Sequence, residues 1–255
     1  MSHENIKDDV IEMLGETNPV NEVVGGILTV NFPDCCAIGW INDYRCSGTL
    51  IAPNLVITAQ HCCNMTHVFV GGNDILEPHQ GQTIAISTQH EHDDVDLRLL
   101  VLAEEAQGIA PRHIAQGSEI GTPAEAVVVG FGTTNSNGTE GYGIKRMARV
   151  PIKSLNCNGD SDAAIYDCKP SKELVAGYIN LNIDTCKGDS GGPLYIKAQD
   201  SNEYYLLGAT SRGAKNAAQL CGDGGIYVRV DYYVDWIQQV TGIDIPGPKE
   251  TSSYI

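Results

Sequence analysis

The chain contains 255 residues, of which 42% are hydrophobic and 19% are charged, so it can bury a substantial core and is neither a disordered nor a fibrous protein. No apolar run approaches the roughly 20 residues that a membrane-spanning helix needs. There are 32 acidic and 16 basic residues, which give a formal net charge of −16. Because such a surface repels phosphate groups, nucleic acid is not an expected partner.

The N-terminal 22 residues are strongly acidic, and Lys7 is their only basic residue. Apolar side chains recur at helical spacing between Ile6 and Leu14, which predicts a short amphipathic helix that ends at Gly15.

Short runs rich in Val, Ile, Leu and Thr predict many strands joined by turns. In the first half of the chain these runs lie at residues 49–51, 55–58, 68–70 and 97–102. Residues 103–125 are rich in Ala, Glu, Gln, Gly and Pro, and we interpret them as a connection between two halves. Strands then resume at residues 126–129 and continue to residues 226–228.

The C-terminal part of the chain carries signals for one helix. Asp231 is expected to cap a helix that runs through Val240 and stops at Gly242. The end of the chain, residues 243–255, is interpreted as a frayed tail.

Nine cysteines, none of them in a C-x-x-C pair, favour disulfides and an oxidising compartment over a zinc ribbon or a thioredoxin-type site. Because nine is odd, at least one thiol is free or bridges to another molecule. The segment that follows Met1 is acidic instead of basic and apolar, so it is not a secretory signal. We therefore expect a secreted protein from which the signal has been removed.

The first candidate for catalytic chemistry is the segment 188–194, which reads GDSGGPL. A serine between glycines can occupy a tight turn with its hydroxyl exposed. The amides of Gly188 and Ser190 can then converge on one point, as an oxyanion hole requires. A lone G-x-S-x-G string would be interpreted as an ordinary glycine-rich turn, but the longer string favours Ser190 as a nucleophile.

A serine nucleophile needs a base to remove its proton, and histidine has a suitable pKa. Among seven histidines we select His61, because it directly follows an apolar strand-like run and because a disulfide at the neighbouring Cys62 could fix its position. A carboxylate must in turn orient the imidazole. Asp96 opens the strand-like run 97–102 and is the candidate, although an acid before a strand more often faces solvent.

Together these segments resemble the trypsin/chymotrypsin family of serine endopeptidases. Residues 58–62 (TAQHC) are similar to the family's TAAHC motif, residues 96–102 to its motif around the aspartate, and residues 188–194 match its nucleophile motif. The order His, Asp, Ser is also that of the family. The resemblance covers about Val23 to Gly242.

The resemblance implies an all-β fold of two antiparallel six-stranded β-barrels with a C-terminal α-helix. The N-terminal barrel would span about residues 23–115, the C-terminal barrel about 125–230 and the helix 231–241. The site would lie in the cleft between the barrels. By this match His61 is the general base, Asp96 orients it, Ser190 is the nucleophile, and the amides of Gly188 and Ser190 form the oxyanion hole.

The resemblance also implies a zymogen in which residues 1–22 form a pro-segment and Val23 becomes the mature N-terminus. The new amino group would pair with Asp189, and this buried pair would order the oxyanion loop. The alternative is that Gly25 and Gly26 form a simple turn. Glu22 precedes the bond that must break.

The family's primary specificity pocket is matched by Asp184 at its floor and by Gly213 and Gly225 at its walls. A carboxylate there would hold an arginine or lysine side chain; otherwise Asp184 is a solvated loop acid. Ser211 and Gly213 match the family's substrate-binding segment, but Arg212 stands where that segment has tryptophan. Arg212 would favour acidic or polar residues upstream of the cut bond, or point to solvent. The loop 214–220 is longer than usual.

Three disulfides are implied by the match to the family. They are Cys46–Cys62, Cys186–Cys221 and Cys157–Cys168. The pairing of Cys35, Cys36 and Cys63 stays open. No metal site is expected, because the polar residues between His90 and Asp94 are interpreted as a loop before Asp96.

We therefore predict a secreted serine endopeptidase, made as a zymogen, that hydrolyses peptide bonds after Arg or Lys through an acyl-enzyme. Expected partners are such protein or peptide substrates and an activating protease, with no cofactor, nucleic acid or membrane. One rival interpretation is a non-catalytic binding or regulatory protein on the same fold, which the complete triad disfavours. The other is a metal-binding or redox protein built around His61, Cys62, Cys63 and His67, in which adjacent cysteines on opposite faces of a strand would chelate poorly.

Overall fold

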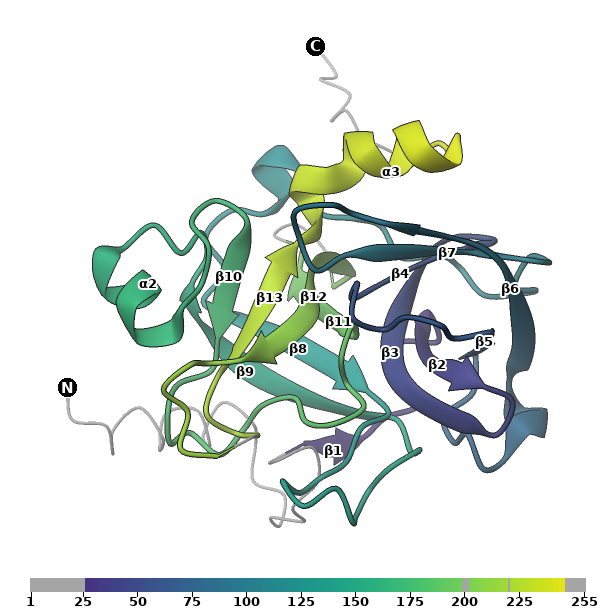
Figure 1. Ribbon diagram of the computed structural model, residues 1–255, viewed down its shortest axis with the longest axis horizontal. Coiled ribbons are helices and arrows are strands. Elements are labelled where there is room, and N and C mark those ends of the chain that lie inside the picture. The colour runs from purple at the N-terminus through teal and green to yellow at the C-terminus, as the bar shows by residue number, and fades with distance from the viewer. Residues whose placement is uncertain (1–25, 199–201, 220, 246–255) are drawn as a thin grey trace.

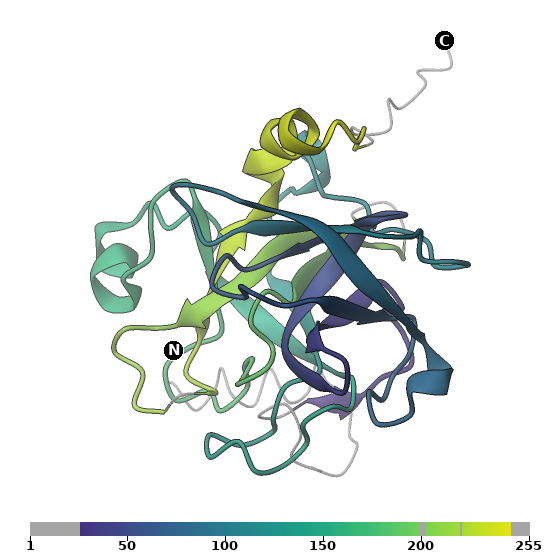
Figure 2. The same ribbon diagram turned by 45° about the vertical axis from the view of Figure 1, so that its right-hand side comes forward.

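The computed structural model describes residues 26–198, 202–219 and 221–245. Two antiparallel barrels lie side by side, with helix α3 and the short strand β1 at opposite ends of the molecule (Figures 1 and 2). The strands are β1 (Ile27–Leu28), β2 (Cys35–Trp40), β3 (Asp43–Ala52), β4 (Leu55–Thr58), β5 (His67–Val70), β6 (Gln82–Glu91), β7 (Arg98–Leu102), β8 (Glu125–Gly130), β9 (Arg146–Ser154), β10 (Glu173–Ala176), β11 (Pro193–Lys197), β12 (Tyr204–Gly213) and β13 (Gly225–Arg229). The α-helices are α2 (Asp160–Tyr166) and α3 (Val234–Thr241), and single 3-10 turns span Pro78–Gln80, Gly117–Glu119 and Val230–Tyr233.

The N-terminal barrel closes in the order β2-β3-β4-β7-β6-β5. Strand β4 is buried along its whole length and lies between β3 and β7, with Ile57 opposite Thr49 on one side and Leu99 on the other. Its unbroken run of apolar residues is typical of a strand that is covered on both faces. Because every ladder is antiparallel, short turns suffice to connect most neighbours.

The C-terminal barrel uses strands β8 to β13 and closes through the pairing of β8 with β9. Strand β1 adds to it as a seventh strand, because Ile27 pairs with Met147 of β9. The sequence analysis predicts that the N-terminal barrel begins at about residue 23 and therefore includes residues 27–28. In the structure this segment lies along the other barrel instead.

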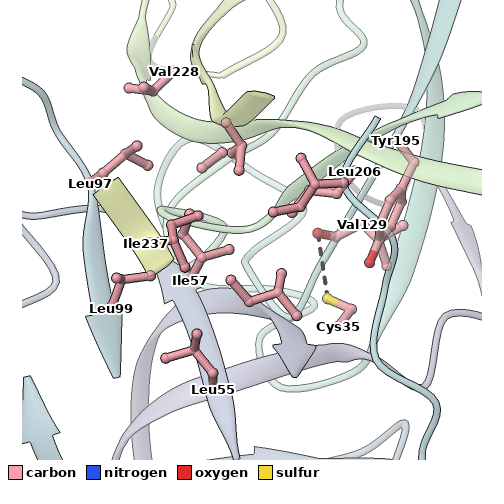
Figure 3. Packing of buried hydrophobic residues seen from close by; sticks show 14 of the residues in the cluster. Cys35, Leu55, Ile57, Leu97, Leu99, Val129, Tyr195, Leu206, Val228 and Ile237 are labelled. Atoms are coloured by element: carbon pink, nitrogen blue, oxygen red, sulfur yellow. Dashed lines mark hydrogen bonds between the residues drawn. The ribbon is translucent and has the colours of Figure 1, made fainter. Parts of the chain in front are cut away.

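A shared apolar core joins the two barrels (Figure 3). Ile57 and Leu99 from the first barrel, Val129 and Tyr195 from the second, and Ile237 from α3 belong to one buried cluster. Burial of each aliphatic side chain of this size contributes about 1.5–3 kcal/mol to folding. The core therefore fixes the barrels relative to each other.

One buried polar network crosses the same boundary. Asp34, at the start of the first barrel, forms a two-pronged ion pair with Arg112 and accepts a hydrogen bond of 2.5 Å from the hydroxyl of Tyr195 in β11. The guanidinium also donates to Tyr204 O at 2.8 Å. A charge this deeply buried is tolerated because its hydrogen-bonding capacity is filled.

The C-terminal helix begins later than the sequence predicts. The Asp231 carboxylate pairs with Arg229 at 2.7 Å instead of capping a helix, and residues 230–233 form a 3-10 turn before α3 begins at Val234. The predicted end is correct, since Gly242 adopts the left-handed conformation, with φ 68°, that closes many helices. The predicted tail is only partly a tail, because Ile245 packs into the shared core.

The acidic pro-segment 1–22, the predicted terminus at Val23 and residues 246–255 lie outside the described residues. Neither of the two helices among the described residues is long and apolar enough to cross a membrane.

Candidate active site

Residues 186–192, here called the nucleophile loop, are the last part of the connection between strands β10 and β11. Lys187 O accepts a hydrogen bond of 2.8 Å from the Thr133 N–H, and Asp189 O accepts one of 2.8 Å from the Gly192 N–H. Because both peptides are trans and planar, the N–H groups of Gly188 and Ser190 point the opposite way from these carbonyls. The N–H groups of the two residues that flank Asp189 are therefore not used to anchor the loop and point away from the carbonyls that are.

The backbone of this loop requires glycine at position 188. Gly188 has φ +98°, and a Cβ atom there would lie 2.8 Å from the Cα of Gly132. A side chain would therefore be strained and would clash with the neighbouring backbone.

His61 and Asp96 lie next to each other at the edge of the N-terminal barrel. His61 follows β4 and Asp96 precedes β7, and these two strands are paired. The imidazole Nδ1 lies 2.9 Å and 3.1 Å from the two carboxylate oxygens, and the His61 N–H donates to Oδ1 at 3.1 Å. The hydroxyl of Ser211 in β12 donates to Oδ2 at 2.6 Å.

These hydrogen bonds keep Asp96 ionised. Burial alone would raise its pKa, but the hydrogen bonds from His61 and Ser211 outweigh burial, and the pKa of Asp96 lies below its ordinary value. An ionised carboxylate held this way can fix the imidazole with its Nε2 directed outward and stabilise it when it becomes positively charged.

Ser190 belongs to the opposite barrel from His61 and Asp96, and backbone contacts link the two barrels there. Ser190 O accepts a hydrogen bond of 2.8 Å from the Ser47 N–H of β3 and lies 3.6 Å from the sulfur of Cys62, the neighbour of His61. Within the described residues, the Ser190 hydroxyl makes no hydrogen bond to His61. Such catalytic hydrogen bonds are often long without substrate and shorten when it binds.

The side chain of Asp189, in the middle of the nucleophile loop, points inward and is buried. Its carboxylate accepts 2.8 Å hydrogen bonds from the N–H groups of Gly132 and Cys186. Burial nevertheless raises its pKa to about 6, against the lowering effect of those donors. The charge of Arg146 also lowers this pKa, but among the described residues the hydrogen-bond donors to the carboxylate are neutral amides. A cation in direct contact would stabilise the carboxylate further.

Asp184 lies six residues before Ser190 and is also buried. The Tyr227 hydroxyl donates to its carboxylate at 2.9 Å, and the Thr185 hydroxyl lies at 3.3 Å. Burial raises its pKa to about 7, although these hydrogen bonds lower it. Gly225 faces this carboxylate closely, since a Cβ there would lie 3.0 Å from its oxygen, and Gly213 pairs with Gly225 across the β12–β13 ladder. The predicted pocket residues are thus neighbours, and Asp184 is not the solvated loop acid of the alternative interpretation.

Arg212 has a partner that the sequence did not reveal. Its guanidinium forms a two-pronged ion pair with the buried Glu173 of β10, at 2.7 Å and 2.9 Å, and donates to Asp167 O at 2.8 Å. The hydrogen bonds that the guanidinium donates to Glu173 raise the pKa of Arg212 further. Arg212 therefore does not simply point to solvent, because its charge is compensated within the protein. The expected preference for acidic or polar residues upstream of the cut bond stays a prediction, and this compensation argues against it.

The long loop 214–220 also has an organising residue that the sequence analysis missed. Asp223 is 1% exposed and accepts hydrogen bonds from the N–H groups of Asn180, Ala218 and Gln219 at 2.7–2.9 Å. The glycines on both sides of Asp223 were the available signal for a constrained turn, but the sequence does not show which amides it binds.

Three disulfides join the pairs implied by the resemblance, Cys46–Cys62, Cys157–Cys168 and Cys186–Cys221. The first anchors the segment that carries His61, and the third links the nucleophile loop to the loop beside Asp184. The three remaining cysteines are free thiols, of which Cys35 and Cys36 are buried and Cys63 is exposed.

A histidine–aspartate pair on one of two antiparallel barrels, with a glycine-flanked serine on the other, defines the class of trypsin-like serine proteases. Residues 32–237 match the family model described as Trypsin. The chain is also 29% identical to coagulation factor XII of Sus scrofa, over 87% of this chain and 40% of that protein. It is 29% identical to ovochymase of Halocynthia roretzi, over 76% of this chain and 13% of that protein.

The chain belongs to the trypsin family. It spans less than half the length of either of these relatives.

Proposed function

We propose that the protein is a serine endopeptidase in which Ser190 is the nucleophile, His61 the general base and Asp96 the group that orients it. The observation that carries this proposal is the chain of hydrogen bonds from Ser211 to Asp96 to the Nδ1 of His61, beside a loop whose Gly188 and Ser190 N–H groups point away from their anchoring carbonyls. These groups have the roles that acyl transfer to a serine requires.

In the first half of the reaction, the Ser190 Oγ attacks the carbonyl carbon of the peptide bond while its proton passes to Nε2 of His61. The carbonyl oxygen becomes an oxyanion, which the N–H groups of Gly188 and Ser190 stabilise. The C–N bond then breaks, and the departing amine takes the proton from His61, leaving an acyl ester on Ser190.

In the second half, His61 removes a proton from water, and the resulting hydroxide attacks the ester. Collapse of this second tetrahedral intermediate returns the proton to the Ser190 oxygen and releases the carboxylic acid. Throughout, Asp96 stays ionised and stabilises the transient imidazolium.

Arg or Lys before the cut bond is the substrate class that Asp184 fits. The buried carboxylate offers a charge for a cationic side chain, and glycine at position 225, which faces it, adds no side chain of its own there. Protein and peptide substrates with such residues are the proposed partners. The three disulfides support secretion into an oxidising environment.

Activation is proposed to follow cleavage after Glu22. The freed Val23 ammonium would then place a cation directly against the buried Asp189, whose hydrogen-bond donors among the described residues are neutral amides, and so order the nucleophile loop. Because Asp184 disfavours an acidic side chain before the cut bond, a protease of different specificity is the proposed activator.

The test is hydrolysis of a peptide with a single arginine by the activated parent, Ser190→Ala and His61→Ala proteins. Both substitutions should lower kcat/KM by several orders of magnitude without changing the circular dichroism spectrum. A fluorophosphonate should label the parent at Ser190 and leave Ser190→Ala unlabelled. Undiminished peptidase activity in folded, contaminant-free Ser190→Ala would exclude the assignment.

A further inference from the structure

Ser47 of β3 makes three hydrogen bonds to the opposite barrel. It is completely buried and follows Cys46 directly. Its N–H donates to Ser190 O at 2.8 Å, its Oγ donates to Gly188 O at 2.9 Å, and the same Oγ accepts from the Phe131 N–H at 3.3 Å. One residue of the first barrel therefore holds two carbonyls of the nucleophile loop, one on each side of Asp189.

The hydroxyl bond matters because of the freedom of Gly188. A glycine adopts many combinations of φ and ψ, so nothing intrinsic keeps its two flanking peptide planes in their present orientation. The Thr133 N–H holds the plane before Gly188 through Lys187 O, and the Ser47 hydroxyl holds the plane after it through Gly188 O. The Gly188 N–H belongs to the first of these planes, and the two planes are joined through the φ and ψ of Gly188. The Ser47 hydroxyl, by holding the second plane, therefore restricts the torsions about Gly188 and with them the direction of the N–H.

We propose that the hydroxyl of Ser47 is a positioning group for the oxyanion hole, acting through the Gly188 carbonyl to keep the Gly188 N–H aimed at the substrate carbonyl oxygen. This inference rests on the proposed function, in which that N–H stabilises the oxyanion. Ser47 does not touch substrate. Its effect is confined to states in which negative charge develops on the carbonyl oxygen.

A purely structural hydrogen bond would have a different signature. Loss of a buried hydroxyl lowers stability and reduces the amount of folded enzyme, but the folded fraction would then bind every ligand with unchanged affinity. Loss of a positioning group weakens the binding of tetrahedral adducts and leaves ligands of the specificity pocket unaffected.

The experiment therefore compares two inhibitors in activated enzyme. A peptide boronic acid with arginine at its boron end forms a tetrahedral adduct with the Ser190 oxygen and reports on the oxyanion hole. Benzamidine occupies the proposed pocket at Asp184 without bonding to Ser190. The variants are Ser47→Ala, and Ser47→Gly, which leaves room for a water molecule and keeps the test valid if the alanine variant folds poorly.

Thr241→Val is the matched control. The Thr241 hydroxyl also donates to a carbonyl, that of Ile237 at 2.6 Å, and accepts from an N–H, that of Ile243 at 3.1 Å, but it lies at the end of α3. Its removal reproduces the loss of a similar pair of hydrogen bonds away from the nucleophile loop.

Both Ser47 variants should bind the boronic acid about tenfold more weakly or worse, with kcat reduced by a similar factor and KM changed much less. Their affinity for benzamidine, and both affinities of Thr241→Val, should stay within about twofold of the parent. Equal weakening of both inhibitors, unchanged boronic acid affinity, or an equal loss in Thr241→Val would overturn the role of Ser47. Failure of the parent itself to form the Ser190 adduct would instead overturn the proposed function.

Discussion

Asp184 combines complete burial with a pKa raised to about 7, and this links recognition of a basic side chain to pH. The ionised carboxylate attracts a cation, whereas the protonated carboxyl does not. As pH falls through 7, a growing share of empty pockets is neutral, so affinity for a cation falls; as pH rises, the affinity recovers.

Benzamidine affinity should accordingly drop about fourfold between pH 8 and pH 6.5, since the ionised fraction of a group with a pKa of 7 drops by that factor. Fluorescence of bound p-aminobenzamidine measures this without relying on turnover. The Asp184→Ser protein is the control, and its weaker affinity should be flat over the same range. A flat response in the parent would show that Asp184 does not titrate there or does not line the pocket.

The pair of Arg212 and Glu173 has its own consequence for extended substrate recognition. Because Glu173 neutralises the guanidinium, the parent should show little preference for acidic residues two to four positions before the cut bond. The Glu173→Gln substitution keeps the shape but removes the compensating charge, so Arg212 should then favour acidic residues there.

Profiling with a peptide library that varies those positions checks the effect, and we expect acidic residues to gain severalfold in kcat/KM in Glu173→Gln. Asp43→Asn, which alters an exposed ion pair with Arg45 in the β2–β3 region, should leave the profile unchanged. A strong acidic preference already present in the parent would contradict this account.

Among the loops, Asp223 ties residues 180 and 218–219 together close to Gly225, the proposed wall of the specificity pocket. Replacing it with alanine leaves three N–H groups without their carboxylate acceptor. Because Asn180, Ala218 and Gln219 are themselves exposed, water can reach these groups, and each lost hydrogen bond should cost only about 0.5–1.5 kcal/mol. The Asp223→Ala protein should therefore melt at a lower temperature and show a larger rise in KM for arginine substrates than fall in kcat.

Calorimetry and steady-state kinetics on the same preparation test this expectation. Asp244→Ala, which removes an exposed carboxylate from the segment after α3, should change neither quantity appreciably. If Asp223→Ala lowered kcat and left KM alone, the loop would not shape the pocket as described.

The elements differ in how well the sequence predicts them. Strands β4, β7 and β8 carry dense apolar runs and lie where the patterns place them. Strand β6 is mostly polar, and only Ile84 and Ile86 carry its alternation, which is too short a signal to predict ten residues of strand. The motifs around His61, Asp96 and Ser190 are local strings and are legible in the sequence. The contacts of Ser47 with Gly188 and of Arg212 with Glu173 join residues 141 and 39 positions apart, and nothing in either local sequence names the partner.

For the molecule as a whole, the acidic residue before Val23 should prevent self-activation. The unmodified precursor, purified free of other proteases, should remain largely inactive because Asp184 repels Glu22. Glu22→Arg should convert it into a precursor that activates itself once a trace of mature enzyme is present.

N-terminal sequencing and the time course of activity measure this outcome, and accelerating activation of the unmodified precursor with Val23 as its new terminus would contradict it.

The activated enzyme should also lose activity at alkaline pH. An α-amino group has a pKa of about 7.7–8.0, and pairing with Asp189 should raise it. The ordered loop is then fully held below the free-amine pKa and lost as pH rises through the raised value.

The division of the site between two barrels makes the chain suited to a split reporter. His61 and Asp96 belong to one half and Ser190 to the other, and the connecting segment exposes Glu104 and Glu105. Opened at that point, the chain would yield two fragments that are each inert, because neither contains a nucleophile together with its base. Fused to two interacting proteins, the fragments would regain turnover when the interaction reassembles the shared core, and each reassembled pair would convert many substrate molecules into signal.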